Sequence, residues 1–178
     1  MTISIVIPVF NKEHYLAESI ASLKNQTYTD VEIIIVDDAS TDHSADIARN
    51  MASKDPRIHV LMHETNRGTL IARKTGILAS TGKYVTFLDP DDLLAPCTCE
   101  RLIAEETVQP ADILHFGVTV VGDERTSEQA VSDMATFMTP TPRTLTGPDI
   151  IATVFSSQGF DWNLAHKLFN GDMIRRVA

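Results

Sequence analysis

The sequence predicts an α/β fold in which a mostly parallel central sheet is flanked by helices on both faces. Over the first two-thirds of the chain, short β-branched runs alternate with segments whose apolar residues recur at helical spacing. Four strand–helix units in succession predict parallel pairing of the strands. Polar clusters follow the strands, and ligands of such sheets bind beyond the carboxyl ends of the strands.

The first unit begins with a strand at residues 3–9, a β-branched run that is typical of a buried strand. Asn11 is a suitable cap for the helix that follows. Leu16, Ile20 and Leu23 recur at helical spacing and give this helix one apolar stripe.

The second unit begins with a buried strand at residues 31–36, which ends in the polar run 37–42. Ser40 and Asp42 are both suitable caps for the next helix, and capping is the preferred interpretation of Asp42. The apolar positions of that helix are Ile47, Ala48 and Met51. Pro56 ends it.

The third unit is a strand at residues 57–62, a turn at 66–68 and a helix that Gly82 ends. The apolar side of this helix consists of Leu70, Ile71, Ile77 and Leu78. The fourth strand is expected at residues 83–88, and the acidic segment 89–92 follows it directly.

Pro96 opens a fourth helix, whose inward residues are expected to be Leu102 and Ile103, and residues 113–121 are expected to form a fifth strand. The pattern then weakens. Residues 122–134 are polar, 140–148 are rich in turn residues, and 149–155 can form a helix. Nothing in this stretch indicates a second domain, so the whole chain is expected to be one domain.

The composition excludes several classes of protein. The 178 residues include 15 Lys and Arg against 24 Asp and Glu, a formal net charge of -9, which argues against nucleic acid as a partner. No apolar run approaches the roughly 18 residues of a membrane-spanning helix, and the first ten residues lack the features of a signal peptide. Cys97 and Cys99 are too close for an ordinary disulfide and are expected to be reduced thiols.

The acidic segment after the fourth strand is the strongest candidate for a metal site. Asp89 and Asp91 are two residues apart in extended or turn backbone, so their carboxylates point the same way. Such a pair repels unless a cation joins it, and all-oxygen ligation suits Mg²⁺ or Mn²⁺. The alternative is a solvated acidic turn that caps the helix after Asp92.

A nucleotide pocket is expected at the ends of the first two strands. A carboxylate of the pair Asp37-Asp38 could accept the imide N–H of a uracil or thymine ring, which Phe10 could flank and Asn11 could hydrogen-bond. The alternatives are that Phe10 belongs to the core and that Asn11 is a simple helix cap. Arg73 could reach a diphosphate or the ribose, or could pair with one of the nearby carboxylates.

Several motifs in this order resemble those of the family 2 glycosyltransferases, whose fold is the Rossmann-like GT-A fold. The motifs are residues 4–11 (SIVIPVFN), 22–28 (SLKNQTY), 32–42 (EIIIVDDASTD), 66–68 (NRG), Ala72-Arg73, Gly76 and 82–92 (GKYVTFLDPDD). Together they cover residues 2–110, and the resemblance points to a bacterial member of the family.

The resemblance implies an inverting, metal-dependent transfer of a sugar from a nucleotide diphosphate donor, most often UDP-linked. It also implies a saccharide or lipid-linked acceptor, often in surface polysaccharide synthesis. Residues 1–110 would bind the donor, and residues 111–178 would begin the acceptor side. The donor-binding residues would be Pro8, Val9, Phe10, Asn11, Asp38, Arg73, Asp89 and Asp91. Mn²⁺ or Mg²⁺ would be held by Asp89 and Asp91, with Asp91 as the direct ligand.

The base that an inverting transfer needs is not evident. In the family, an acidic pair follows a segment that Trp162-Asn163 and residues 166–169 resemble, although ordinary packing also explains Trp162 and Leu168. Because the chain stops at Ala178, soon after this segment, we expect a truncated domain with its base beyond the end. Asp161 is the remaining candidate within the chain.

The sequence leaves three other functions to compare. The first is a donor-binding module without turnover. A phosphoacceptor receiver domain is disfavoured because the acidic pair Asp37-Asp38 follows the second strand rather than the first. A dinucleotide oxidoreductase is disfavoured because no Gly-x-Gly-x-x-Gly motif follows the first strand. A cytoplasmic location is expected, while attachment of the full-length protein to the inner membrane face and homo-oligomer formation are left open.

Overall fold

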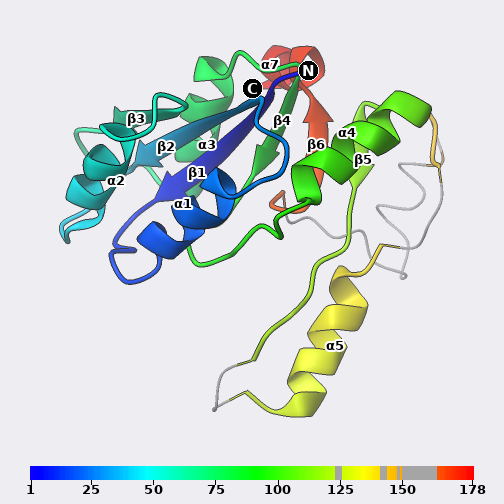
Figure 1. Ribbon diagram of the computed structural model, residues 1–178. Coiled ribbons are helices and arrows are strands. Elements are labelled where there is room, and N and C mark those ends of the chain that lie inside the picture. The colour runs from blue at the N-terminus through cyan, green and yellow to red at the C-terminus, as the bar shows by residue number, and fades with distance from the viewer. Residues whose placement is uncertain (123–125, 141–143, 148, 150–163) are drawn as a thin grey trace. The chain divides into compact units, whose positions relative to one another are not determined.

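A six-stranded sheet forms the centre of the computed structural model (Figure 1), which describes residues 1–122, 126–140, 144–147, 149 and 164–178. The strand order is β3-β2-β1-β4-β6-β5. The strands are β1 (Ile3–Val9), β2 (Val31–Asp37), β3 (Ile58–Met62), β4 (Tyr84–Phe87), β5 (Ile113–His115) and β6 (Lys167–Asn170). The chain forms two compact units, one made of Met1–Leu114 and Lys167–Ala178 and the other of His115–His166.

The prediction of a mostly parallel sheet is confirmed. β1 pairs in parallel with β2 and with β4, and β2 pairs in parallel with β3. β6 runs antiparallel to β4, with Tyr84 opposite Asn170. The carboxyl ends of the four parallel strands therefore meet at one edge of the sheet.

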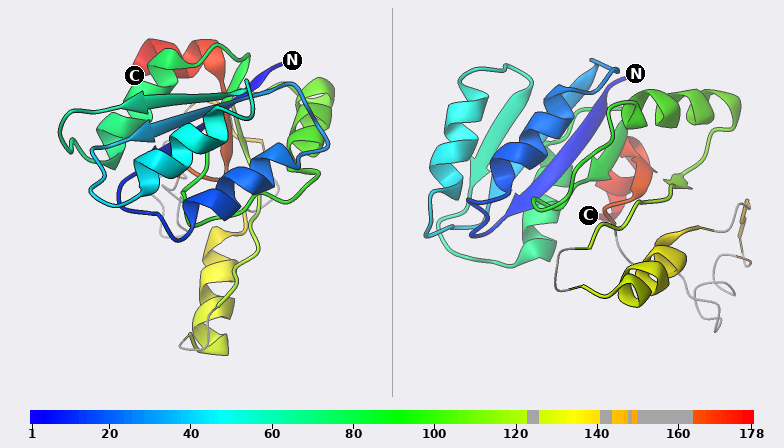
Figure 2. Two further views of the ribbon diagram at one scale, coloured as in Figure 1. Left: turned by 60° about the vertical axis from the view of Figure 1, so that its left-hand side comes forward. Right: turned by 60° about the horizontal axis from the view of Figure 1, so that its bottom comes forward.

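Helices cover both faces of the sheet, as predicted (Figures 1 and 2). α1 and α2 lie on one face, and α3 and α7 lie on the other. The helices are α1 (Leu16–Lys24), α2 (Ser44–Ala52), α3 (Thr69–Ala79), α4 (Thr98–Val108), α5 (Glu128–Met138) and α7 (Gly171–Val177). None of the helices in the described ranges has the length and apolar character that crossing a membrane requires.

The close approach of α3 to β1 depends on a glycine. A Cβ atom at Gly76 would lie 2.3 Å from Cγ1 of Val6, far inside normal contact distance. The absence of a side chain at Gly76 therefore lets α3 lie directly on the apolar surface of β1. This packing fixes the position of α3, which carries Arg73 and Thr75 toward the carboxyl edge of the sheet.

The later part of the chain differs from the sequence expectation. β5 ends at His115 rather than extending to residue 121, because it is an edge strand whose one neighbour, β6, has only four residues. Within the second unit, α5 forms in the segment that was expected to be merely polar. Ser127 caps it by accepting a hydrogen bond from Ala130 N. The assignment of the whole chain to one domain, with residues 1–110 binding the donor, stays a prediction.

Candidate functional site

The loops that follow β1, β2, β3 and β4 bring most of the predicted site residues to the carboxyl edge of the sheet. The loops after β1 and β2 are joined by five hydrogen bonds that backbone N–H groups donate to side chains, and we call residues 10–15 and 38–44 the paired loops. These bonds run from Asn11 N to Ser40 Oγ (3.0 Å), Lys12 N to Ser44 Oγ (2.8 Å), Glu13 N to Asp42 Oδ2 (3.0 Å), Thr41 N to Asn11 Oδ1 (2.8 Å) and His43 N to Glu13 Oε2 (2.9 Å).

The capping role expected for Asn11 is wrong. α1 begins only at Leu16, and Asn11 adopts a left-handed backbone with φ of 52°, from which its side chain accepts a hydrogen bond from Thr41 instead. Asparagine tolerates this backbone region better than most residues do. Asp42 does help to start α2, because its Oδ1 accepts a hydrogen bond from Ser44 N, at the first residue of that helix, at 2.9 Å.

The residues expected to flank a base fall into two groups. Pro8 and Val9 are buried within β1, and Val9 O accepts a hydrogen bond from Asp38 N at 2.8 Å. Phe10 and Asn11 are exposed, and the Phe10 side chain is 44% exposed, so Phe10 does not belong to the core. An exposed aromatic ring directly after β1 is available for stacking.

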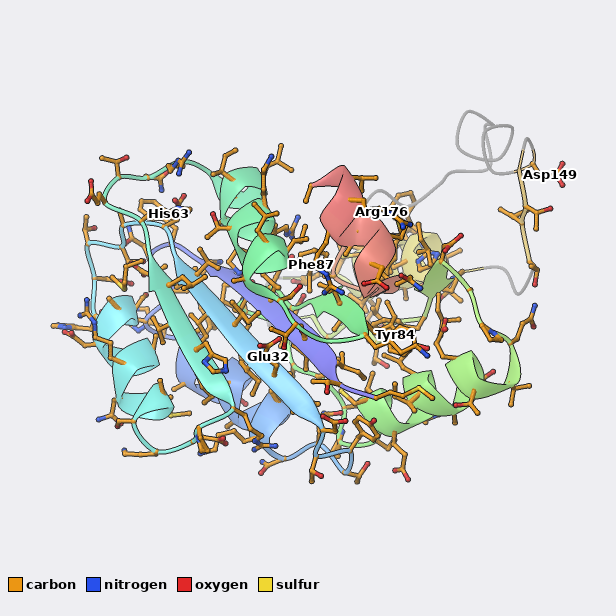
Figure 3. All side chains as sticks on the ribbon, turned by 90° about the horizontal axis from the view of Figure 1, so that it is seen from above. Glu32, His63, Tyr84, Phe87, Asp149 and Arg176 are labelled. Carbon is orange, nitrogen blue, oxygen red and sulfur yellow. The ribbon has the colours of Figure 1, made fainter. Side chains whose placement is uncertain are left out.

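Asp38 is the most heavily bonded of the predicted site residues. Its carboxylate accepts hydrogen bonds from the backbone N–H groups of Arg67, at 2.9 Å, and of Gly68, at 2.7 Å. His63 Nδ1 lies 2.6 Å from Asp38 Oδ1, and His63 Nε2 lies 2.9 Å from Thr75 Oγ1 on α3. Asp38 thereby ties the loop after β3, where His63 lies (Figure 3), to the end of β2.

The Asp38 carboxyl is held in its ionised form. Burial by itself would raise its pKa, but the hydrogen bonds from His63 and from the N–H groups of Arg67 and Gly68 outweigh burial, so the pKa lies below its usual value. An ionised carboxylate only accepts hydrogen bonds, so Nδ1 of His63 carries the proton that it donates to Asp38. The Arg67 N–H is shared by both oxygens, at 2.9 and 3.1 Å, so each oxygen of this carboxylate already accepts two hydrogen bonds.

A pocket of about 340 Å³ lies next to this cluster. Its lining residues are Met62, His63, Glu64, Thr65 and Arg67. Two of them, His63 and Arg67, are also hydrogen-bonding partners of Asp38. A ligand that fills the pocket would therefore lie close to the Asp38 carboxylate.

The acidic pair after β4 is accessible, and each carboxylate already has a cationic partner. Arg73 donates to Asp89 Oδ1 at 2.7 Å, and Lys12 donates to Asp91 Oδ2 at 2.7 Å. The side chains of Asp89 and Asp91 are 31% and 46% exposed. Arg73 is more buried, and its Nε has no hydrogen-bond partner among the described residues.

Helix α3 connects Asp38 with the acidic pair Asp89 and Asp91. Arg73 reaches Asp89 from this helix, and Thr75 reaches His63, which in turn contacts Asp38. Gln26, a buried residue after α1, holds the segment that follows β4. Its side chain donates a hydrogen bond to Ala95 O at 2.8 Å and accepts one from Cys99 N at 3.1 Å. The carboxylates of Asp38, Asp89 and Asp91 are thus linked to one another through side chains at the carboxyl edge of the sheet.

The donor set at Asp89 and Asp91 suits a hard divalent cation. Both side chains offer carboxylate oxygens to solvent, and Mg²⁺ is commonly bound by one or two carboxylates together with substrate phosphates. Among the described residues, no three His, Cys, Asp or Glu side chains gather closely enough to hold a metal ion by themselves. A cation here would therefore need ligands from a bound molecule or from water.

The alternative that Arg73 pairs with a nearby carboxylate is confirmed by its bond to Asp89, but the other two partners of the predicted acids were missed. His63 and Lys12 carried no local signal, because they meet Asp38 and Asp91 across 25 and 79 positions of the sequence. Leu168 is buried in β6, as the packing alternative expected. Asp161 and Trp162-Asn163 lie outside the described residues.

Comparison with known proteins agrees with the architecture. The model of glycosyl transferase family 2 matches residues 4–167. The glycosyltransferase EpsJ of Bacillus subtilis is 33% identical over 180 aligned positions, which are 98% of this chain and 49% of EpsJ. A glycosyltransferase of Escherichia coli, YibD, is 39% identical over 111 positions, 62% of this chain and 32% of YibD. The chain spans about half the length of EpsJ and less of YibD.

Solved structures share the fold. A fragment of S. aureus TarS in complex with UDP superposes with a TM-score of 0.76 at 23% identity, over 99% of this chain and 49% of that one. The mannosyltransferase PcManGT from Pyrobaculum calidifontis, in complex with GDP-Man and Mn²⁺, superposes with a TM-score of 0.70 at 18% identity, over 99% of this chain and 46% of that one. The chain therefore adopts the GT-A fold and belongs to glycosyl transferase family 2.

Proposed function

We propose that the protein transfers a sugar from a UDP-linked donor to an acceptor hydroxyl with inversion, and that this chain supplies the donor-binding part. The observation that carries the proposal is the accessible pair Asp89 and Asp91 on the same sheet edge as Asp38, with Arg73 bound to Asp89. The TarS structures with UDP and with UDP-GlcNAc support a nucleotide-sugar donor.

The base of the nucleotide is assigned to the pocket beside Asp38. The Asp38 carboxylate is 3% exposed and would exchange one of its present hydrogen bonds for the N–H of uracil, whereas adenine presents no such N–H there. Phe10 would stack on the ring, and Asn11 would lie beside it. Pro8 and Val9 have buried side chains, so their contribution would be to shape the backbone that carries Phe10.

The diphosphate is assigned to the cations beside the acidic pair. Arg73 would keep its bond to Asp89 and offer its unpartnered Nε to the nucleotide. Asp91, with Asp89, would hold Mn²⁺ or Mg²⁺, and when bound, the ion would neutralise the charge of the departing diphosphate. The Mn²⁺ in the PcManGT structure supports this choice of cation.

The acceptor hydroxyl must lose its proton to a base while it attacks the anomeric carbon. That the base lies beyond Ala178 stays a prediction, and Asp161 lies outside the described residues. The proposed acceptor is a saccharide or a lipid-linked saccharide on the cytoplasmic side of the membrane, used in building surface polysaccharide.

Titration calorimetry with UDP, in the presence and absence of Mn²⁺, tests the assignment. We expect Mn²⁺ to strengthen UDP binding, Asp91→Asn to abolish that effect, and Asp46→Asn to leave it intact, because Asp46 is exposed on α2. Asp38→Asn should weaken UDP about tenfold and reduce the preference for UDP over ADP. If UDP binds equally well with and without Mn²⁺, the metal role is wrong, and if Asp38→Asn binds both nucleotides like the wild type, the uracil role is wrong.

A donor-binding module without turnover is the second candidate, because the chain spans about half the length of EpsJ. An assay of sugar transfer from UDP-linked sugars to saccharide acceptors separates the two. Metal-dependent UDP binding without transfer would favour the binding module for this chain.

A further inference from the structure

We propose that Lys12 is an exchangeable counter-ion of the site, which pairs with Asp91 in the free protein and moves to the donor's diphosphate when the divalent cation takes Asp91. This inference rests on the proposed function and assigns a positioning role to a residue outside the predicted site. It makes binding of the cation and binding of the diphosphate mutually dependent.

The geometry places Lys12 between the two binding partners. Its backbone N–H is fixed to Ser44 Oγ at 2.8 Å within the paired loops, while its Nζ reaches Asp91 Oδ2 at 2.7 Å. The side chains of Lys12 and Asp91 are 33% and 46% exposed, so the pair is open to exchange. A lysine has a flexible four-carbon stem, so Nζ can change partner while the backbone stays in place.

The charges explain why the exchange is needed. Lys12 and Arg73 each pair with one carboxylate of Asp89 and Asp91, so the four formal charges (two positive and two negative) sum to zero. A divalent cation that approaches this neutral group gains less than it would from two bare carboxylates. It must also displace Lys12 from Asp91. A diphosphate supplies the negative charge that can receive the released lysine.

A thermodynamic consequence follows. The Lys12–Asp91 pair must be broken when the cation binds alone and also when the diphosphate takes Lys12 alone, but it is broken only once when both bind. The strength of the pair therefore adds to the coupling between the two ligands, and by reciprocity each raises the affinity for the other by the same factor. Without Lys12, this part of the coupling disappears.

The test is the affinity of the protein for Mn²⁺, measured by the electron paramagnetic resonance signal of the free ion, with and without saturating UDP. We expect Lys12→Met to bind Mn²⁺ alone about two- to fivefold more tightly, the range that corresponds to an exposed ion pair. With saturating UDP, its Mn²⁺ affinity should equal that of the wild type. The enhancement by UDP therefore falls by the same factor.

This design separates exchange from a simple effect of charge. If Lys12 acted only as a fixed positive charge, its removal would tighten Mn²⁺ equally with and without UDP. Equal tightening, or no change in either condition, overturns the proposal. Uridine, which lacks phosphates, should bind Lys12→Met as it binds the wild type, and weaker uridine binding would also contradict the role at the diphosphate.

Lys54→Met is the matched control, because it makes the same change of charge at a lysine that follows α2 and contacts Asn50 Oδ1. It should leave the Mn²⁺ affinity unchanged both with and without UDP.

Binding by the wild type distinguishes a failure of the proposed function from a failure of the role of Lys12. If the wild type binds neither UDP nor Mn²⁺, the proposed function fails. If it binds both and Lys12→Met behaves identically, only the role of Lys12 is wrong.

Discussion

The contact between Gly76 and Val6 gives a sharp test of how the site is positioned. In Gly76→Ala, the new Cβ would lie 2.3 Å from Val6 Cγ1 and 3.0 Å from Val6 Cγ2, whereas carbon atoms pack at about 3.5 to 4.0 Å. Both atoms belong to packed elements, so α3 must move away from β1 or Val6 must leave its rotamer.

The size of the effect can be worked from opposing terms. Overpacking of this kind destabilises by roughly 1–3 kcal/mol, and replacing glycine by alanine within a helix returns about 1 kcal/mol. We therefore expect a net loss of up to ~2 kcal/mol. Val6→Ala alone removes two methyl groups worth about 0.8 kcal/mol each, but in the double variant it also removes the clash. The double variant should then be more stable than the sum of the single effects by about 1 kcal/mol.

The assay is urea unfolding followed by circular dichroism for the wild type, both single variants and the double variant. A loss of UDP affinity should accompany Gly76→Ala, because a displaced α3 carries Arg73 away from Asp89 and Thr75 away from His63. The double variant should recover much of it. Additive effects of the two substitutions on stability would refute the direct contact as the cause.

Two further predictions concern groups away from the site. Hydrogen bonds from Arg57 lower the pKa of the Asp55 carboxyl from 3.8 to about 2, so this pair should contribute ~2 kcal/mol above pH 4 that is lost as the pH falls toward 2. Urea unfolding should therefore show that Asp55→Asn is less stable than the wild type at pH 7 but equally stable below pH 2. Asp46→Asn, at an exposed position, is the control and should match the stability of the wild type at both pH values. Burial raises the pKa of the Cys99 thiol to about 12, while Cys97 is exposed. Iodoacetamide at pH 8 should therefore label one thiol of the folded protein and both thiols of the unfolded one, and labelling of folded Cys97→Ser would contradict the burial of Cys99.

The sequence predicted β1, β2 and β4 because runs of β-branched and aromatic residues are typical of strands buried on both faces, as the complete burial of β1 and β4 illustrates. β3, at the edge of the sheet, is only partly buried, and its short apolar run was enough to predict it. The sequence also placed Asp38, Asp89 and Asp91 at strand ends, since position at the end of a buried strand is a local property. The order of the strands in the sheet could not be predicted from such local patterns. β6, which pairs with β4 over 80 residues upstream, is only four residues long and has no distinctive alternation.

The partners of the acids could not be predicted for a related reason. Lys12 meets Asp91 through a contact that forms only after separate strand–helix units have packed side by side. Arg73 differs, because its pairing with a nearby carboxylate was an alternative that the sequence offered, and it pairs with Asp89. Asn11 was assigned to a helix cap because a local role is the one that a single sequence suggests. Its actual partner, Thr41, lies in the neighbouring unit.

The paired loops constrain how this protein could be re-engineered. Three consecutive backbone N–H groups, at residues 11 to 13, each find their acceptor on a side chain of the second loop, and two side chains of the first loop accept in return. Inserting or deleting one residue in either loop would shift all of these contacts out of register together. A chimera that exchanges residues 10–15 with a relative would therefore need residues 38–44 from the same parent, and the two segments would be inherited as one module.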